Sequence, residues 1–165
     1  NDTASFDGQY VKFKDVSVSP RPRQLPNPPI WVGGNSRVAM KRAVLHGDAW
    51  HPIGPRTDWL RSVGMPTLRS MAEEENRPTP ALAPRIFCRI TDDPIPEDVR
   101  IAGEGTLDQI KRDFDELQEL GAQYVHLDTK RNNPTAHTGR HHDEAWRDLI
   151  VLADEVFDLD RETLR

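Results

Sequence analysis

Two glycines followed by two polar residues, Gly33-Gly34-Asn35-Ser36, form the sequence feature that points most directly to ligand chemistry. They follow the apolar run Ile30-Trp31-Val32 and precede a segment with helical spacing, which places them between a strand and a helix. Paired glycines let a phosphate approach the backbone closely, and a helix N-terminus offers unpaired N–H groups and a partial positive charge. A tight turn with an ordinary helix cap is the alternative, and the motif matches neither a dinucleotide fingerprint nor a P-loop.

Trp50 and His51 are the second candidate, because they lie in a short apolar segment, residues 48–53, that we expect to be a strand. Folds of the α/β class bind their ligands at the carboxyl ends of strands. An imidazole at that place could contact the edge of a cofactor ring or a substrate oxygen. The alternative is that Trp50 only packs and His51 only faces solvent.

Other reactive side chains give weaker indications. His137, His141 and His142 have no Cys or Glu partner at ligand spacing, so we expect a solvated loop and no metal site. Cys88 lies among apolar neighbours without an adjacent histidine, which favours a small buried residue over a nucleophile. Asp128 ends an expected strand and could line a polar mouth. The sequence assigns no catalytic residue.

The elements that would position these residues alternate between strand and helix patterns. Strands are expected at residues 30–32, 48–53, 85–90 and 124–128. Helices are expected from Asn35 or Ser36 to Gly47, over 57–76 with a break or kink at Gly64 and Pro66, from a capping box at 106–109 to Gly121, and over 143–157. This alternation predicts a parallel α/β sheet with right-handed crossovers. Because the usual eight-stranded barrel takes about 250 residues, four βα units make half a barrel or a small open sheet.

Residues 1–29 precede this pattern as a separate connector. Alternating apolar residues at 9–13 and 16–18 predict two short strands or a loose hairpin, and five prolines between Pro20 and Pro29 predict an extended segment. Residues 30–165 then make a single α/β domain.

Composition narrows the function classes. The 165 residues carry 22 basic and 27 acidic side chains, a net charge of −5, which argues against a nucleic-acid partner. No apolar run approaches the roughly 20 residues that cross a bilayer, and the N-terminus does not resemble a signal peptide. A single cysteine excludes an internal disulfide framework. We therefore expect a cytoplasmic protein without a membrane or nucleic-acid partner.

Several motifs occur together in a fixed order and carry a family resemblance. They are Phe6-Asp7-Gly8, Pro20-Arg21-Pro22, Pro28-Pro29-Ile30-Trp31-Val32-Gly33-Gly34-Asn35-Ser36, Gly47-Asp48-Ala49-Trp50-His51-Pro52, Gly105-Thr106-Leu107-Asp108-Gln109-Ile110 and Gly121-Ala122. With these motifs the chain resembles the C-terminal half of bacterial-luciferase-like monooxygenases. The branch it resembles most uses the deazaflavin coenzyme F420.

The resemblance implies a fold and a cofactor. Members of that family are (β/α)8 barrels that bind reduced FMN or F420 at the C-terminal mouth. The resemblance implies that Gly33, Gly34, Asn35 and Ser36 hold the cofactor phosphate, and that Trp50 and His51 line the mouth. The family's first four βα units, which carry most proton-transfer groups, have no counterpart in this sequence.

We therefore expect the C-terminal half of a luciferase-like TIM barrel from an F420- or FMN-dependent oxidoreductase or monooxygenase. The parent enzyme would act on a small organic molecule, whereas the isolated chain would be inactive. Its partner would be the missing N-terminal half-barrel or a second copy. The alternatives are a non-catalytic half-barrel module that dimerises, and a plain α/β domain whose glycine turn is only a cap.

Overall fold

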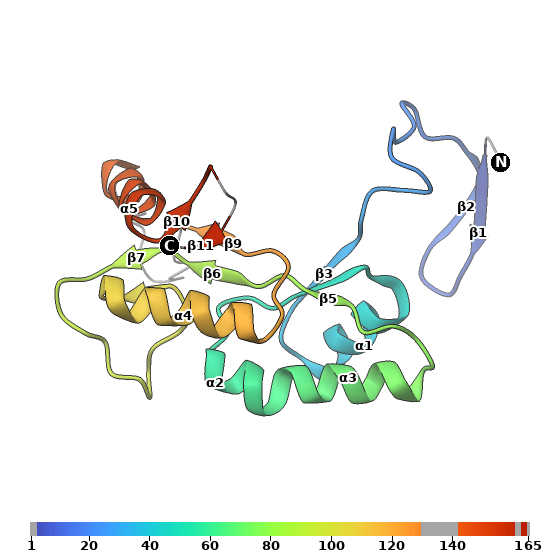
Figure 1. Cartoon of the computed structure of the whole chain (residues 1–165). Helices are drawn as coiled ribbons and strands as arrows, with labels where there is room; N and C mark the ends of the chain where they lie inside the picture. Colours follow the sequence, from blue (N-terminus) through green and yellow to red (C-terminus); the bar gives the residue numbers. More distant parts are fainter. Residues whose placement is uncertain (1–2, 130–141, 161–162, 165) are drawn as a thin grey trace.

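Short parallel strands form the centre of the molecule in the computed structural model, which describes residues 3–129, 142–160 and 163–164. One sheet has the order β3 (Trp31–Gly33), β4 (Ala49–His51), β5 (Ala81–Leu82), and β6 (Arg85–Phe87) pairs with β9 (His126–Asp128). Single parallel bridges, Ile53 to Arg85 and Leu82 to Ala122, connect the two sheets. Neighbouring strands therefore follow one another in chain order, as predicted for a parallel α/β fold (Figure 1).

The strand expected at residues 85–90 is interrupted at Cys88, between β6 and β7 (Arg89–Ile90). β7 pairs with a further short strand, β8 (Glu104–Gly105), and β5 precedes β6 in the chain. Pro84 separates β5 from β6, and it has no N–H to donate to a neighbouring strand. Its carbonyl still accepts the His126 N–H at 2.9 Å, so the strand keeps its direction across the break.

The helices are α1 (Arg37–His46), α2 (Thr57–Trp59), the π-helical segment η1 (Leu60–Gly64), α3 (Met65–Glu74), α4 (Leu107–Glu119) and α5 (His142–Glu155). In Figure 1, α3 and α4 lie below the strands, whereas α5 is drawn above β7. The predicted break at Gly64 and Pro66 is a π turn inside a continuous helical segment. A single π turn inside an α-helix replaces the i→i−4 hydrogen bonds locally by i→i−5 bonds, and it is a known cause of a kink.

The predicted helix caps are confirmed. Ser36 accepts a hydrogen bond from the Ala39 N–H, and Gly47 ends α1 with a bond from its own N–H to the Ala43 carbonyl. Thr106 and Gln109 form both bonds of a capping box at the start of α4. These caps depend only on residues close in sequence, which is why the sequence predicts them well.

Replacing Thr106 with alanine should lower the free energy of unfolding by about 1 kcal/mol, because the Gln109 N–H loses its side-chain acceptor. Urea denaturation followed by circular dichroism measures this change. The affinity for any ligand at the β3–α1 turn should stay the same. A fall in affinity at unchanged stability would contradict the structural role of Thr106.

The core lies between the strands and the helices. Alternate strand residues, Val32, Trp50, Leu82 and Ile86, point into it and meet Met40, Leu68, Ile110 and Leu117 from the helices. Successive side chains of a strand point to opposite faces. The other side chains of the same strands therefore lie on the face opposite α1, α3 and α4, which we call the open face and define by Trp31, Gly33, His51, Arg85, Tyr124 and His126.

A buried ion pair fixes the long segment before α4. Arg100 donates to both carboxylate oxygens of Asp113, at 2.6 and 2.8 Å, and the Gly103 N–H donates to the same carboxylate at 2.9 Å. Both side chains are almost fully buried. The pair therefore joins the segment 91–105 to α4 through a largely buried site.

The N-terminal segment forms a hairpin that projects away from the other elements (Figure 1). Its strands are β1 (Ala4–Asp7) and β2 (Lys12–Val16), so both expected strands are shifted toward the N-terminus. The reason is the turn, because the Gly8 N–H donates to the Val11 carbonyl at 3.0 Å and residues 8–11 reverse the chain. At the other end, β10 (Phe157–Asp158) pairs with β11 (Thr163–Leu164).

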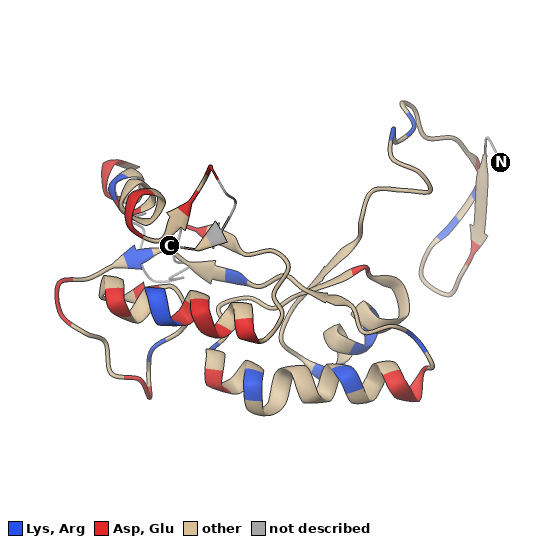
Figure 2. Ribbon diagram, viewed as in Figure 1, with Lys and Arg blue, Asp and Glu red and all other residues tan. Residues whose placement is uncertain are grey.

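Charged side chains of both signs occur along the helices, as Figure 2 shows for α3 and α4. Among the described residues, we find no helix whose length and apolar character would suit a passage through a bilayer.

Candidate functional site

The turn between β3 and α1 is held against β4 by hydrogen bonds. Gly34 donates its N–H to the His51 carbonyl at 3.2 Å, and its own carbonyl accepts the indole N–H of Trp50 at 2.8 Å. Gly34 has a φ of +112°, a conformation that residues with a side chain rarely adopt. This residue therefore has to be a glycine for the turn to form.

Asn35 acts as a clamp within the turn. Its side-chain amide donates to the Ile53 carbonyl at 2.8 Å, and its side-chain oxygen accepts the Ile53 N–H at 2.8 Å. The Asn35 side chain thus forms with Ile53, just after β4, the two hydrogen bonds that the backbone of a neighbouring strand would form. One amide hydrogen of Asn35 remains for other partners.

Ser36 and the start of α1 leave donors available. The Ser36 oxygen accepts the Ala39 N–H at 3.2 Å, and none of the described residues accepts its hydroxyl hydrogen. The first N–H groups of a helix have no acceptor within the helix, and here they include those of Arg37 and Val38.

Gly33 leaves space beside these donors. A Cβ atom at Gly33 would lie 3.8 Å from the His51 carbonyl oxygen and 4.0 Å from Cδ1 of Ile53, which is ordinary contact. The turn therefore combines free N–H donors with an open approach, as an anion-binding turn requires.

Trp50 does not lie at a rim, as the resemblance implied, but in the core. Its side chain is fully buried, and its ring lies 6.1 Å from that of Trp59. The reason is strand alternation, because Val32 and Leu82 are its register partners and all three face the helices. Trp50 therefore supports the turn through Gly34 and offers no surface to a ligand.

His51 faces the other way, onto the open face. Its Nδ1 lies 2.6 Å from the Ala83 carbonyl oxygen, and the side chain is half-buried. Its ring centroid lies 5.6 Å from that of Trp31 and 5.7 Å from that of His126. The structure thus brings His51 next to the glycine turn, as expected, while placing Trp50 behind it.

Aromatic rings from distant strands meet on the open face. Trp31 of β3 and Tyr124, two residues before β9, lie 5.2 Å apart between ring centroids. Both remain largely exposed, at 42% and 55%. Neither Trp31 nor Tyr124 nor His126 was predicted from the sequence to be a site residue. The expected strands 30–32 and 124–128 alternate with a period of two, which could have indicated that these residues share one face.

The remaining candidates from the sequence either contact other side chains, lie in the core, or are not among the residues that the structure describes. Asp128 lies on the same strand face as His126, where its buried carboxylate accepts hydrogen bonds from Arg85, one of them at 2.9 Å. Cys88 is buried in the core. His142 accepts the indole N–H of Trp146 at 2.8 Å, while His137 and His141 lie outside the described residues. Within the described part of the chain, no cluster of three or more potential metal ligands occurs.

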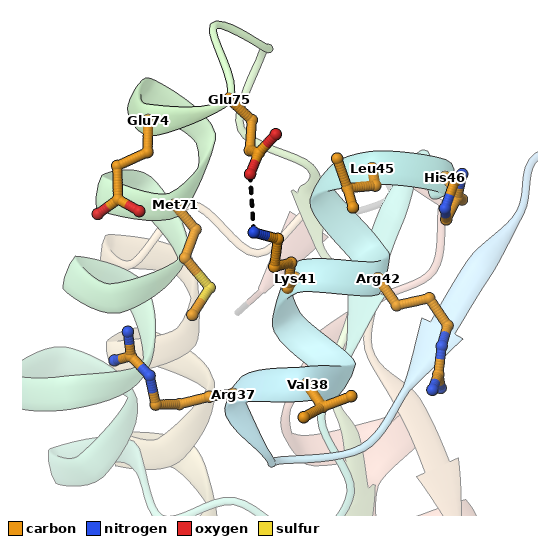
Figure 3. A pocket seen from close by; sticks show the side chains of 9 residues that line it. All are labelled: Arg37, Val38, Lys41, Arg42, Leu45, His46, Met71, Glu74 and Glu75. Carbon is orange, nitrogen blue, oxygen red and sulfur yellow. Dashed lines mark ion pairs between the residues drawn. The ribbon is translucent and has the colours of Figure 1, made fainter.

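A surface groove of about 550 Å³ lies between α1 and α3 (Figure 3). An ion pair between Lys41 and Glu75, at 2.9 Å, crosses it. The hydrogen bond to Glu75 raises the pKa of the Lys41 ammonium group above its ordinary value. The groove begins at Arg37 and Val38, the first residues of α1, and none of the residues that define the open face line it.

A family model for luciferase-like monooxygenases matches residues 1–154. The chain belongs to this family. The match covers the hairpin, the glycine turn and every parallel strand. It therefore confirms the family that the motifs indicate.

Individual relatives of this luciferase-like chain are similar over shorter stretches. An FMNH2-dependent dimethylsulfone monooxygenase from Pseudomonas putida is 33% identical over 61 residues, which are 37% of this chain and 17% of that enzyme. A solved F420-dependent secondary alcohol dehydrogenase, bound to an F420–acetone adduct, aligns with a TM-score of 0.60 and 14% identity over 77% of this chain and 50% of its own. A coenzyme F420-dependent tetrahydromethanopterin reductase from Methanopyrus kandleri aligns with a TM-score of 0.58 and 14% identity over 74% of this chain and 51% of its own.

The luciferase-like chain therefore spans about half the length of the two solved structures that it matches. At 14% identity these two likenesses concern the fold. The names of these relatives include both F420 and FMNH2.

Proposed function

We propose that this chain is the C-terminal half-barrel of an F420- or FMN-dependent oxidoreductase or monooxygenase, and that its β3–α1 turn holds the cofactor phosphate. The observation that carries the proposal is the turn itself. Gly33 leaves an open approach, Gly34 takes a left-handed conformation, and the first turn of α1 presents N–H groups beside them.

Strand order supports the half-barrel. The strands follow one another in parallel and in chain order, which is the order of a (β/α)8 barrel. The rings of Trp31 and Tyr124 meet although β4 and the β5–β6 segment lie between their strands, so the open face is strongly concave. Coverage of about half of each solved relative agrees with a half-barrel.

The residues of this chain would bind and orient the cofactor. When bound, reduced flavin or F420 supplies the hydride or the oxygen chemistry of this class of enzyme. The turn donates N–H groups to the phosphate, and Asn35 and Trp50 keep the turn in place. Because productive transfer needs reacting atoms about 3–3.5 Å apart, the substrate must be held from the opposite wall as well. Four further βα units would supply that wall, and a small organic molecule would be the substrate.

A non-catalytic assembly module is the second candidate. The observation that favours it is the exposed apolar surface of the hairpin, where Phe6 and Phe13 lie 6.1 Å apart on an isolated two-stranded ribbon. Such ribbons are only marginally stable in water unless they pack against another surface. This candidate predicts a defined dimer that binds phosphate compounds and has no redox activity.

Replacing Gly33 with alanine tests the phosphate assignment. The fold should tolerate the change, since the nearest atoms lie at ordinary contact distance and φ is not positive. The added methyl group would, however, point into the space where the phosphate approaches. We expect the FMN or F420 dissociation constant, measured by titration, to rise at least tenfold.

Replacing Gly34 with valine should have a larger effect for two reasons at once. A Cβ at Gly34 would lie 3.1 Å from the Ala39 Cβ and would also require a strained φ. Circular dichroism should therefore show a loss of stability for Gly34→Val and none for Gly33→Ala. If Gly33→Ala binds both cofactors as tightly as the original chain, the turn does not hold their phosphate.

A further inference from the structure

The imidazole of His51 is held in one tautomer. Its Nδ1 lies 2.6 Å from the Ala83 carbonyl oxygen, and a carbonyl can only accept a hydrogen bond. Nδ1 must therefore carry the hydrogen. In a neutral imidazole the other nitrogen, Nε2, is then a hydrogen-bond acceptor.

The orientation of the ring is fixed as well. Trp31 and His126 lie on the same face with ring centroids 5.6 and 5.7 Å from that of His51. Together with the bond to Ala83 they restrict rotation of the imidazole. No hydrogen-bond partner for Nε2 occurs among the residues that the structure describes. His51 thus presents an oriented acceptor without a protein donor on the open face.

The position of this acceptor relative to the turn defines what it can bind. Gly33 and His51 are register partners in the β3–β4 pair, and the His51 carbonyl accepts the Gly34 N–H at 3.2 Å. The open approach above Gly33 is bordered by His51 and Ile53. A ligand whose phosphate sits on the turn would therefore carry its next few atoms past His51.

We propose that Nε2 of His51 accepts a hydrogen bond from a hydroxyl of the polyol chain that joins the phosphate to the ring system in FMN and in F420. This inference rests on the proposed phosphate role of the turn. A neutral acceptor nitrogen repels phosphate oxygens, which are acceptors themselves, whereas a hydroxyl supplies the missing donor. The polyol hydroxyls are also the donors nearest to the phosphate, while the ring lies several bonds farther away.

The tautomer can be tested on the 165-residue chain without any ligand. Long-range nitrogen–proton correlation NMR distinguishes the two neutral forms of each histidine. We expect the Nδ1-protonated form for His51. The opposite tautomer, or an imidazole that exchanges freely between both, would overturn the proposal because Nε2 would not be a fixed acceptor.

Three probes then separate the polyol from the phosphate: FMN, ribitol 5-phosphate and inorganic phosphate, each titrated against the backbone amides of the turn by NMR. Replacing His51 with phenylalanine should weaken FMN and ribitol 5-phosphate binding about three- to tenfold, the range of one neutral hydrogen bond. Binding of inorganic phosphate should not change. His51→Gln, whose side-chain oxygen can accept in place of Nε2, should restore most of the loss.

The outcomes separate this inference from the proposed function. Gly33→Ala should weaken all three probes, since each contains the phosphate. If the probes bind but His51→Phe weakens none of them, or weakens inorganic phosphate as much as the others, the polyol role is wrong and the phosphate role stands. If none of the probes perturbs the turn amides, both proposals fail.

Discussion

The isolated chain should self-associate at tens of micromolar and should show no F420- or flavin-dependent turnover. The first and last parallel strands, β3 and β9, each have a partner on one side only among the described residues. The open face carries exposed rings, and the hairpin exposes further aromatic side chains. Burying 1,000 Å² of apolar surface is worth on the order of 25 kcal/mol before ordering and association costs are subtracted. Strand edges add a directional route to pairing.

Light scattering coupled to size-exclusion chromatography measures the assembly against the monomer mass of 18.8 kDa. Trp31→Glu would place a charge on the open face and should raise the monomer fraction. Val99→Glu, at an exposed position of the segment 91–105, is the matched control for a charge added elsewhere. A monodisperse original chain at the monomer mass would show that the open face is not adhesive. Turnover by that monomer would overturn the half-barrel proposal.

Replacing Asp113 with alanine should lower the free energy of unfolding by about 3–5 kcal/mol, because the variant leaves the buried Arg100 guanidinium with a single carboxylate partner, that of the exposed Glu97. The Gly103 N–H would lose its acceptor in the same step. Segment 91–105 and α4 should separate first. Urea denaturation at low protein concentration, followed by circular dichroism, gives the change.

Two control variants make the Asp113 result specific. The exposed ion pair between Arg61 and Glu119, at 3.0 Å, should contribute less than about 1 kcal/mol, so Glu119→Ala should change stability little. The double variant Arg100→Met with Asp113→Leu removes both charges and should lose less than Asp113→Ala alone. Equal losses for Asp113→Ala and Glu119→Ala would mean that the buried pair is not a special source of stability.

Features that depend on residues close together in the chain could be predicted from the sequence. The cap at Ser36, the capping box from Thr106 to Gln109 and the end of α1 at Gly47 all involve residues within four positions of one another, and each is present in the structure. The alternation of strands and helices predicted the parallel order, because a helix between two consecutive strands forms the crossover that parallel pairing needs. The linked motifs also indicated the luciferase-like family, which the family model confirms.

The roles of the candidate side chains depend on contacts between residues that lie far apart in the chain. Trp50 faces the core and supports Gly34, 16 residues away, and Asn35 clamps Ile53, 18 residues away. Asp128 is paired with Arg85 across 43 residues, and His51 owes its tautomer to Ala83, 32 residues away. A strand pattern gives two faces but does not state which one meets the helices. That choice, and the partner of each polar group, follows from how the strands and helices pack, which local sequence does not encode.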